Sequence, residues 1–119
     1  MQEYEVLFYE KGDGSEPAKD FILSLDIKMQ AKVMRTIQLL QNNGPQLREP
    51  YSKSLGDGIF ELRTKVGNDI SRVLYFFIVG RYVILTNGFI KKTQKTPPEE
   101  INRAKTFRAE YLSRKEKQQ

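Results

Sequence analysis

The chain has 119 residues, a usual length for a single domain, and 39% of them are hydrophobic. Its net charge of +5 favours a polyanionic partner such as a nucleic acid. The absence of histidine and cysteine excludes a histidine-paired ribonuclease mechanism, a Ser-His-Asp triad, a zinc hydrolase site and a disulfide framework. Any catalysis must therefore use Arg, Lys, Tyr, Asp or Glu.

The first half of the chain predicts one strand followed by two helices. Residues 5–9 form an apolar, aromatic run that ends in a Gly-rich turn signal. Ser15 is predicted to cap a helix that begins near Pro17, and Asp26 is predicted to cap a second helix. Asn43-Gly44-Pro45 should end that helix. Its inner stripe is expected to be Ile27, Ala31, Met34, Ile37 and Leu39 or Leu40.

The second half predicts three strands and a last helix. Residues 46–58 are polar and irregular, and the strand-like runs are residues 59–63, 72–79 and 82–90. Short turn signals between these runs predict an antiparallel meander. Pro97-Pro98 should open the last helix, and the charged tail at residues 113–119 is expected to fray.

This order of elements predicts one α+β domain spanning residues 1–119. Two helices near the N-terminus should cover one face of an antiparallel sheet, and the other face should stay partly open, with a C-terminal helix completing the fold. The acidic start is unlike a signal peptide, and the longest apolar run is far shorter than a membrane span. We therefore expect a cytoplasmic protein with no membrane partner.

The basic residues at neighbouring strand ends suggest a site for an anion. Arg63 and Arg72 should be brought together by the hairpin that joins their strands, and a cationic pocket forms if both lie on one face. Arginine binds two phosphate oxygens with its planar fork, and lysine adds a mobile point charge. The lysines expected near this pocket are Lys53, Lys91, Lys92 and Lys95. Each of these charges, taken alone, could equally be a solvated strand end.

Two further residues near the arginines, Tyr75 and Glu61, are predicted together with Lys53 and Lys95 to contact RNA, and each of the two allows a second interpretation. Tyr75 could stack on an RNA base if it is exposed, or it could be a sheet aromatic packed against a helix. Glu61 could accept a proton, or it could be an ion-pair partner of Lys91 or Arg72, which we favour. No P-loop, Rossmann, zinc or calcium spacing occurs in the sequence, so we expect neither metal nor cofactor.

Two segments resemble the phage Gp49-like, or HigB, branch of the RelE/ParE toxins. The more specific segment is Phe89-Ile90-Lys91-Lys92 continuing to Lys95-Thr96-Pro97, and the other is Gly58-Ile59-Phe60-Glu61-Leu62-Arg63, followed by residues 71–77. The order of predicted elements is similar too, so the resemblance covers essentially the whole chain. The sequence differs from RelE at Glu61, where RelE carries a lysine, and lacks the histidines of some HigB toxins.

The resemblance implies a RelE-like (microbial RNase-like) fold and ribosome-dependent cleavage of messenger RNA. It implies inhibition by a HigA-like helix-turn-helix antitoxin, with operator DNA bound only through the complex. By position, Arg72 matches the arginine that contacts the scissile phosphate. Basic positions around that arginine are matched by Arg63, Lys53 and either Lys91 or Lys92.

Two other functions fit the same sequence. One is a ParE-like inhibitor of DNA gyrase, which has this fold without RNA chemistry. The other is a non-catalytic module that binds nucleic acid or protein. The basic residues at positions 63, 72 and 91 favour the ribonuclease toxin over the gyrase inhibitor.

Overall fold

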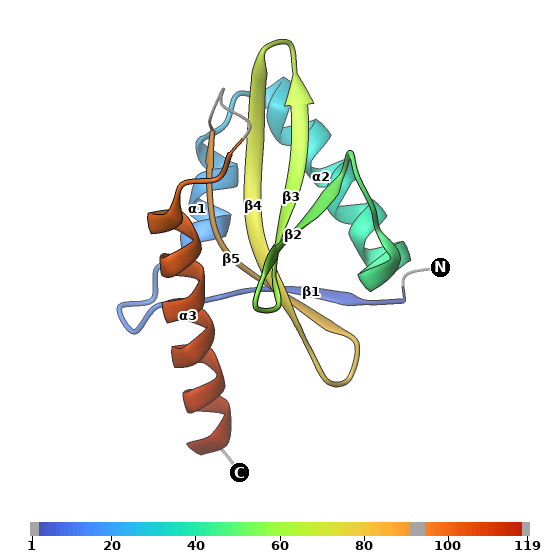
Figure 1. Ribbon diagram of the computed structural model, residues 1–119. Helices are drawn as coiled ribbons and strands as arrows, with labels where there is room; N and C mark the ends of the chain where they lie inside the picture. Colours follow the sequence, from blue (N-terminus) through green and yellow to red (C-terminus); the bar gives the residue numbers. More distant parts are fainter. Residues whose placement is uncertain (1–2, 91–94, 118–119) are drawn as a thin grey trace.

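The computed structural model describes residues 3–90 and 95–117, and Figure 1 shows its arrangement. The strands are β1 (Glu5–Phe8), β2 (Ser52–Gly56), β3 (Ile59–Val66), β4 (Asp69–Ile78) and β5 (Tyr82–Ile90). The helices are α1 (Pro17–Ser24), α2 (Ile27–Asn43), the short 3-10 helix η1 (Gly44–Gln46) and α3 (Pro98–Lys117). The predicted α+β class is confirmed.

The five strands form one sheet in the order β1-β5-β4-β3-β2. The strands β2 to β5 pair antiparallel, as the predicted meander requires, while β1 lies parallel to β5 at one edge. The sequence analysis missed β2 because its Ser-Lys-Ser start has no apolar alternation. This strand forms because a tight turn with positive φ at Gly56, Asp57 and Gly58 folds it back onto β3.

The β3–β4 hairpin is longer than predicted. Pairing continues to Val66 and Asp69, so the turn is made by Gly67-Asn68 alone. Arg63 and Arg72 were expected at strand ends, and that placement is wrong. Arg72 is the fourth residue of a central strand that is hydrogen-bonded on both sides, which removes it from the rim of the sheet.

The helices α1 and α2 cover one face of the sheet, as predicted. The predicted inner stripe of α2 is confirmed at Ile37 and Leu40 and is wrong at Ile27, Ala31 and Met34, since Ile27 is 87% exposed and Met34 is 49% exposed. The residues that face the sheet are Met29, Val33, Thr36, Ile37 and Leu40. Apolar residues lie on more than one side of this helix, and the sequence pattern alone does not choose between them.

Local hydrogen bonds fix where the two helices begin. Asp26 caps α2 as predicted, and its carboxylate accepts from the backbone N–H of Met29 at 2.8 Å. The predicted cap of α1 is wrong: Glu16 is the cap residue, and it makes no side-chain capping bond. Ser15 instead donates to the carboxylate of Asp13 within the preceding turn.

The helix α3 packs on the opposite face of the sheet, where Ala104 and Phe107 are buried against residues of β3, β4 and β5. Arg108 ties the helix to the β2–β3 turn by donating to the backbone carbonyl and the carboxylate of Asp57. The helix continues through residues 113–117, where the sequence predicted a frayed tail. In Figure 1 α3 runs along one side of this face of the sheet.

A β-bulge divides β5 into two parts. Tyr75 pairs with Leu85 and Leu74 pairs with Asn87, so Thr86 is an extra residue in β5. The bulge turns Asn87 and Phe89 toward α3. Gly88 then faces α1, where a Cβ atom would lie only 2.4 Å from the ring of Phe21.

Candidate functional site

The two arginines of the β3–β4 hairpin lie opposite each other in the register, as the sequence predicted. Directly paired residues of antiparallel strands point to the same face. The ion pairs that Arg63 and Arg72 both make with Glu61 place all three side chains on the α3 face. We call these three residues, together with Thr96, the polar cluster.

Glu61 organises the polar cluster. It is 1% exposed, and its Oε1 lies 3.1 Å from Nε of Arg72 and 3.5 Å from Nε of Arg63. Its Oε2 accepts a hydrogen bond of 2.6 Å from the hydroxyl of Thr96. Of the two roles considered for Glu61, the ion-pair partner is the one that the geometry supports, and a direct contact with RNA is contradicted by its burial.

Arg72 is fully buried, so the expectation that its side chain reaches solvent is wrong. The cause is its position inside β4, between Arg63 on one neighbouring strand and Phe89 on the other. Burial lowers the pKa of the guanidinium, the charge of Glu61 raises it, and the charge of Arg63 lowers it again. Its Nη1 also donates to the Thr96 hydroxyl at 3.5 Å.

Arg63 is the arginine of the cluster that meets solvent. Its side chain is 19% exposed, against 0% for Arg72. The strand β2 begins only at Ser52, opposite Leu62, and the backbone N–H of Arg63 donates to the carbonyl of Tyr51 just before that strand. Arg63 therefore lies where the sheet narrows, with one side anchored by Glu61 and the other open.

Tyr75 lies on the wrong face to stack on RNA, so that interpretation is wrong. It is 1% exposed and belongs to the core under α1 and α2, where its ring stacks on Phe60. Its hydroxyl shares a 2.5 Å hydrogen bond with Ser52. Burial raises the pKa of Tyr75 to about 12. Tyr75 therefore belongs to the core, apart from the polar cluster on the other face.

The predicted lysines are only partly within the described chain. Lys53 is exposed on β2 and pairs in register with Glu61, so it lies on the face of the polar cluster. Lys95 is exposed immediately before Thr96. Lys91 and Lys92 lie outside the described residues, and their part in the site stays a prediction.

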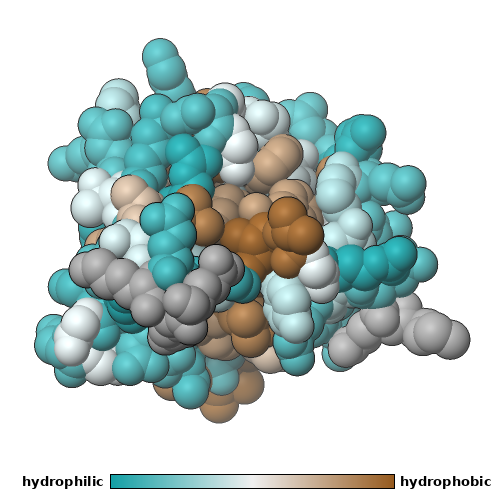
Figure 2. Space-filling view, turned by 90° about the horizontal axis from the view of Figure 1, so that it is seen from below, coloured by the Kyte–Doolittle hydropathy of each residue, from teal (hydrophilic) through white to brown (hydrophobic). Residues whose placement is uncertain are grey.

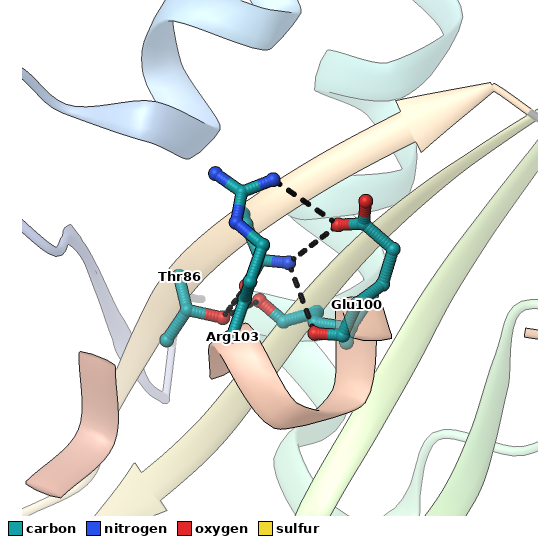
Figure 3. Close-up of polar contacts among 5 residues, drawn as sticks. Thr86, Glu100 and Arg103 are labelled. Atoms are coloured by element: carbon teal, nitrogen blue, oxygen red, sulfur yellow. Dashed lines mark hydrogen bonds and ion pairs between the residues drawn. The ribbon is translucent and has the colours of Figure 1, made fainter. Parts of the chain in front are cut away.

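The sequence analysis missed the residues that anchor the start of α3 (Figure 3). The side-chain amide of Asn87 donates to the carbonyl and carboxylate of Glu100, at 3.3 and 3.0 Å. Thr86 donates to Asn87 at 2.7 Å, and Arg103 lies 3.4 Å from the same carboxylate. The signal in the sequence that could have indicated this network is the pair of polar residues, Thr86 and Asn87, inside the predicted strand of residues 82–90. This network and Thr96 together hold the segment that follows Lys95 over the sheet.

The opposite end of the molecule carries an apolar hollow of about 510 Å³. Figure 2 views this end, and brown hydrophobic surface gathers at its centre. Val79, at the β4–β5 turn, is 96% exposed, and Leu112 of α3 is 40% exposed. The hollow is lined by Tyr4, Pro45, Phe77, Ile78, Val79, Arg81 and Leu112. Of these lining residues only Arg81 is charged, so the hollow offers a polyanion little positive charge.

Within the described residues, 3–90 and 95–117, no three or more acidic, His or Cys side chains form a group that could hold a metal ion. No helix in these same ranges is long and apolar enough to cross a membrane. The residues of the polar cluster supply positive charge and hydrogen-bonding groups.

The five-stranded sheet with two helices on one face and a C-terminal helix is consistent with the RelE-like fold. Residues 20–109 match the family described as "Phage derived protein Gp49-like (DUF891)". The chain belongs to this family, which is a family of RelE/HigB-like toxins, and membership implies an antitoxin partner. A comparison with curated proteins found no match.

The burial of the Glu61–Arg72 pair generates a prediction about stability. Glu61→Gln should lower the free energy of unfolding by about 3–5 kcal/mol, because it leaves a buried guanidinium without its counter-charge. Urea denaturation measures this change. The control Glu16→Gln removes a partly exposed ion pair with Lys19 and should change the free energy by less than about 1 kcal/mol.

A second variant separates lost charge compensation from lost packing. Adding Arg72→Met to Glu61→Gln removes the uncompensated charge and should recover part of the stability. If the double variant is less stable than Glu61→Gln alone, the ion pair is not what Glu61 contributes.

Proposed function

We propose that this protein is the toxin of a type II toxin–antitoxin pair, of the HigB branch, and a metal-independent endoribonuclease that cleaves messenger RNA on the ribosome. The observation that carries the proposal is the partly exposed side chain of Arg63. It is held by the buried Glu61–Arg72 pair, and the exposed Lys53 lies on the same face. Such a cluster presents fixed positive charge to a phosphate. Membership of a toxin family supports the same interpretation.

The chemistry proposed for the cluster is phosphate binding during attack by the neighbouring 2′-hydroxyl. The 2′-hydroxyl gives up its proton as its oxygen forms a bond to phosphorus, the bond to the 5′-oxygen breaks, and that oxygen takes up a proton, leaving a 2′,3′-cyclic phosphate and a 5′-hydroxyl. Negative charge builds on the phosphate oxygens, and a guanidinium placed in advance stabilises it. Arg63 is the candidate for this contact because it is exposed, and Arg72 is a positioning residue because it is buried.

Proton transfer is the step for which the polar cluster is poorly equipped. Its one carboxylate, Glu61, is buried and already bound to Arg72 and Thr96. The chain has no histidine. We infer that the ribosome aligns the RNA and assists proton transfer, so that positioning supplies much of the rate.

The ribosome requirement can be measured directly. Single-turnover cleavage of one messenger RNA should be fast when it is bound to ribosomes and slow when it is free, because only the ribosome orients the 2′-hydroxyl for attack. A gyrase supercoiling assay with the same preparation should show no inhibition. Equal rates on free and ribosome-bound RNA would contradict the inferred dependence.

The arginines should differ in what their loss affects. Arg63→Ala should lower the cleavage rate on the order of a hundredfold, the effect of losing one good donor to a developing charge, with little change in melting temperature. Arg63→Lys should recover only part of the rate, since a point charge cannot reproduce the planar fork. Arg72→Ala should lower both the rate and the melting temperature because Arg72 is buried.

The matched control is Arg81→Ala, which removes an exposed arginine from the β4–β5 turn at the other end of the sheet. It should cleave at the wild-type rate. A folded Arg63→Ala protein with wild-type activity would show that Arg63 does not bind the scissile phosphate.

We propose that the partner is a HigA-like helix-turn-helix antitoxin. In the complex, only the antitoxin would contact operator DNA. The exposed basic residues around the polar cluster suit an acidic segment of that antitoxin, which would block the site. The Kd of the complex should rise with salt, and Lys53→Glu should raise it further. A Kd that is independent of salt between low and physiological ionic strength would argue against this electrostatic contact.

A further inference from the structure

A second basic site lies beside the polar cluster, in a cavity of about 350 Å³ between α2 and β3. We call it the basic cavity. Its volume is within the range of pockets that bind small organic ligands. The residues that the argument uses are Lys32, Thr36, Tyr51, Arg63, Thr64 and Lys65, all of which line it.

The cations of the basic cavity come from two elements. Lys32 belongs to α2, while Arg63 and Lys65 belong to β3. The ammonium of Lys32 donates to the backbone carbonyl of Lys65 at 2.5 Å, which holds the Lys32 side chain against β3. Among the described residues that line this cavity, none is acidic. The cavity therefore concentrates positive charge.

The cavity also offers an aromatic ring and hydroxyl groups. Tyr51 is 44% exposed, so its ring is available to a ligand, and its backbone is fixed because its carbonyl accepts from the N–H of Arg63. The buried hydroxyls of Thr36 and Thr64 are hydrogen-bonded to each other at 3.0 Å in the wall between α2 and β3. An exposed ring beside several cations is the combination that binds a nucleotide of single-stranded RNA.

Arg63 connects the basic cavity to the polar cluster. Its Nε is 3.5 Å from the carboxylate of Glu61, and Arg63 is also one of the residues that line the cavity. The two sites are therefore continuous across the edge of the sheet, at the level where β2 has not yet begun. A phosphate held by Arg63 would place the adjoining nucleotide at the mouth of the cavity.

We propose that the basic cavity is a nucleotide subsite, in which a base next to the scissile phosphate stacks on Tyr51 and its phosphate is held by Lys32. The inference rests on the proposed RNA-cleaving function and adds to it a place for a neighbouring nucleotide. Stacking on Tyr51 is tolerant of base identity, because every base offers an aromatic face. The subsite therefore contributes affinity and alignment more than sequence preference.

The test is direct binding of a fluorescein-labelled, fully 2′-O-methylated RNA hexamer, which cannot be cleaved by attack of a 2′-hydroxyl. Fluorescence anisotropy gives its Kd. Tyr51→Ala should raise the Kd about tenfold, while Tyr51→Phe, which keeps the ring, should stay within about twofold of wild type. Unchanged melting temperatures for both variants confirm that the fold is intact.

The proposed contact of Lys32 with phosphate is tested by the salt dependence of RNA binding. Lys32→Ala should reduce the slope of log K against log salt concentration by about 0.7, the value for one lost phosphate contact on a single strand. Lys28→Ala is the matched control, since it removes an exposed lysine one turn earlier on the same helix and outside the cavity. Its salt slope should equal that of wild type.

The outcomes separate the subsite from the proposed function. If Tyr51→Ala binds the hexamer as wild type does, and Arg63→Ala still loses cleavage on ribosomes, the subsite is wrong and the ribonuclease proposal stands. If Lys32→Ala and Lys28→Ala change the salt slope equally, Lys32 holds no phosphate. If the wild-type protein neither binds the hexamer nor cleaves RNA on ribosomes, both proposals fail together.

Discussion

The buried ion pair between Glu61 and Arg72 is the constraint on which the α3 face of the sheet depends. Two opposite charges removed from water are stable only while each keeps the other and the remaining polar atoms are satisfied. Here the pair joins neighbouring central strands, and Thr96 closes it from above. The position of Arg63 follows from this pair, and so does the path of the chain into α3.

This arrangement divides two tasks between two arginines that face each other in the register. Arg72 contributes charge from below the surface and cannot move, because it is packed on every side. Arg63 shares the same carboxylate but keeps part of its side chain in solvent. A rigid buried charge beneath a partly exposed one is a good arrangement for electrostatic stabilisation, since little reorganisation is needed when a phosphate arrives.

Much of the fold could be predicted from the sequence, because its signals are local. Asp26, Pro17 and Gly44 mark helix ends, and alternating aromatic residues mark the central strands. The pairing of Arg63 with Arg72 followed from the hairpin. The burial of Arg72 did not, since it depends on how far the hairpin extends past the two arginines, and the side chains of residues 64–71 do not indicate that length.

The parts of the site that could not be predicted involve contacts between distant segments. Thr96 lies in a stretch with no periodicity, and its meeting with Glu61 is purely tertiary. In the sequence, nothing distinguishes Lys32 from a solvated charge or Tyr51 from an aromatic residue in a loop. They line one cavity only because α2 lies beside β3. Tyr75 was uncertain because alternation shows that neighbouring residues face opposite sides without showing which side holds the helices.

The extra residue at Thr86 sets the face on which every later side chain of β5 lies. If Thr86 paired with Leu74 in an unbroken ladder, Asn87 and Phe89 would face α1 and Gly88 would face α3. The anchor of α3 on Glu100 would then be lost, and two side chains would enter a space that now accepts only a glycine. The bulge thus takes up one residue of chain length: a chain without Thr86 would keep the later side chains on their present faces and lose only the hydrogen bonds that Thr86 makes to Leu74 and Asn87.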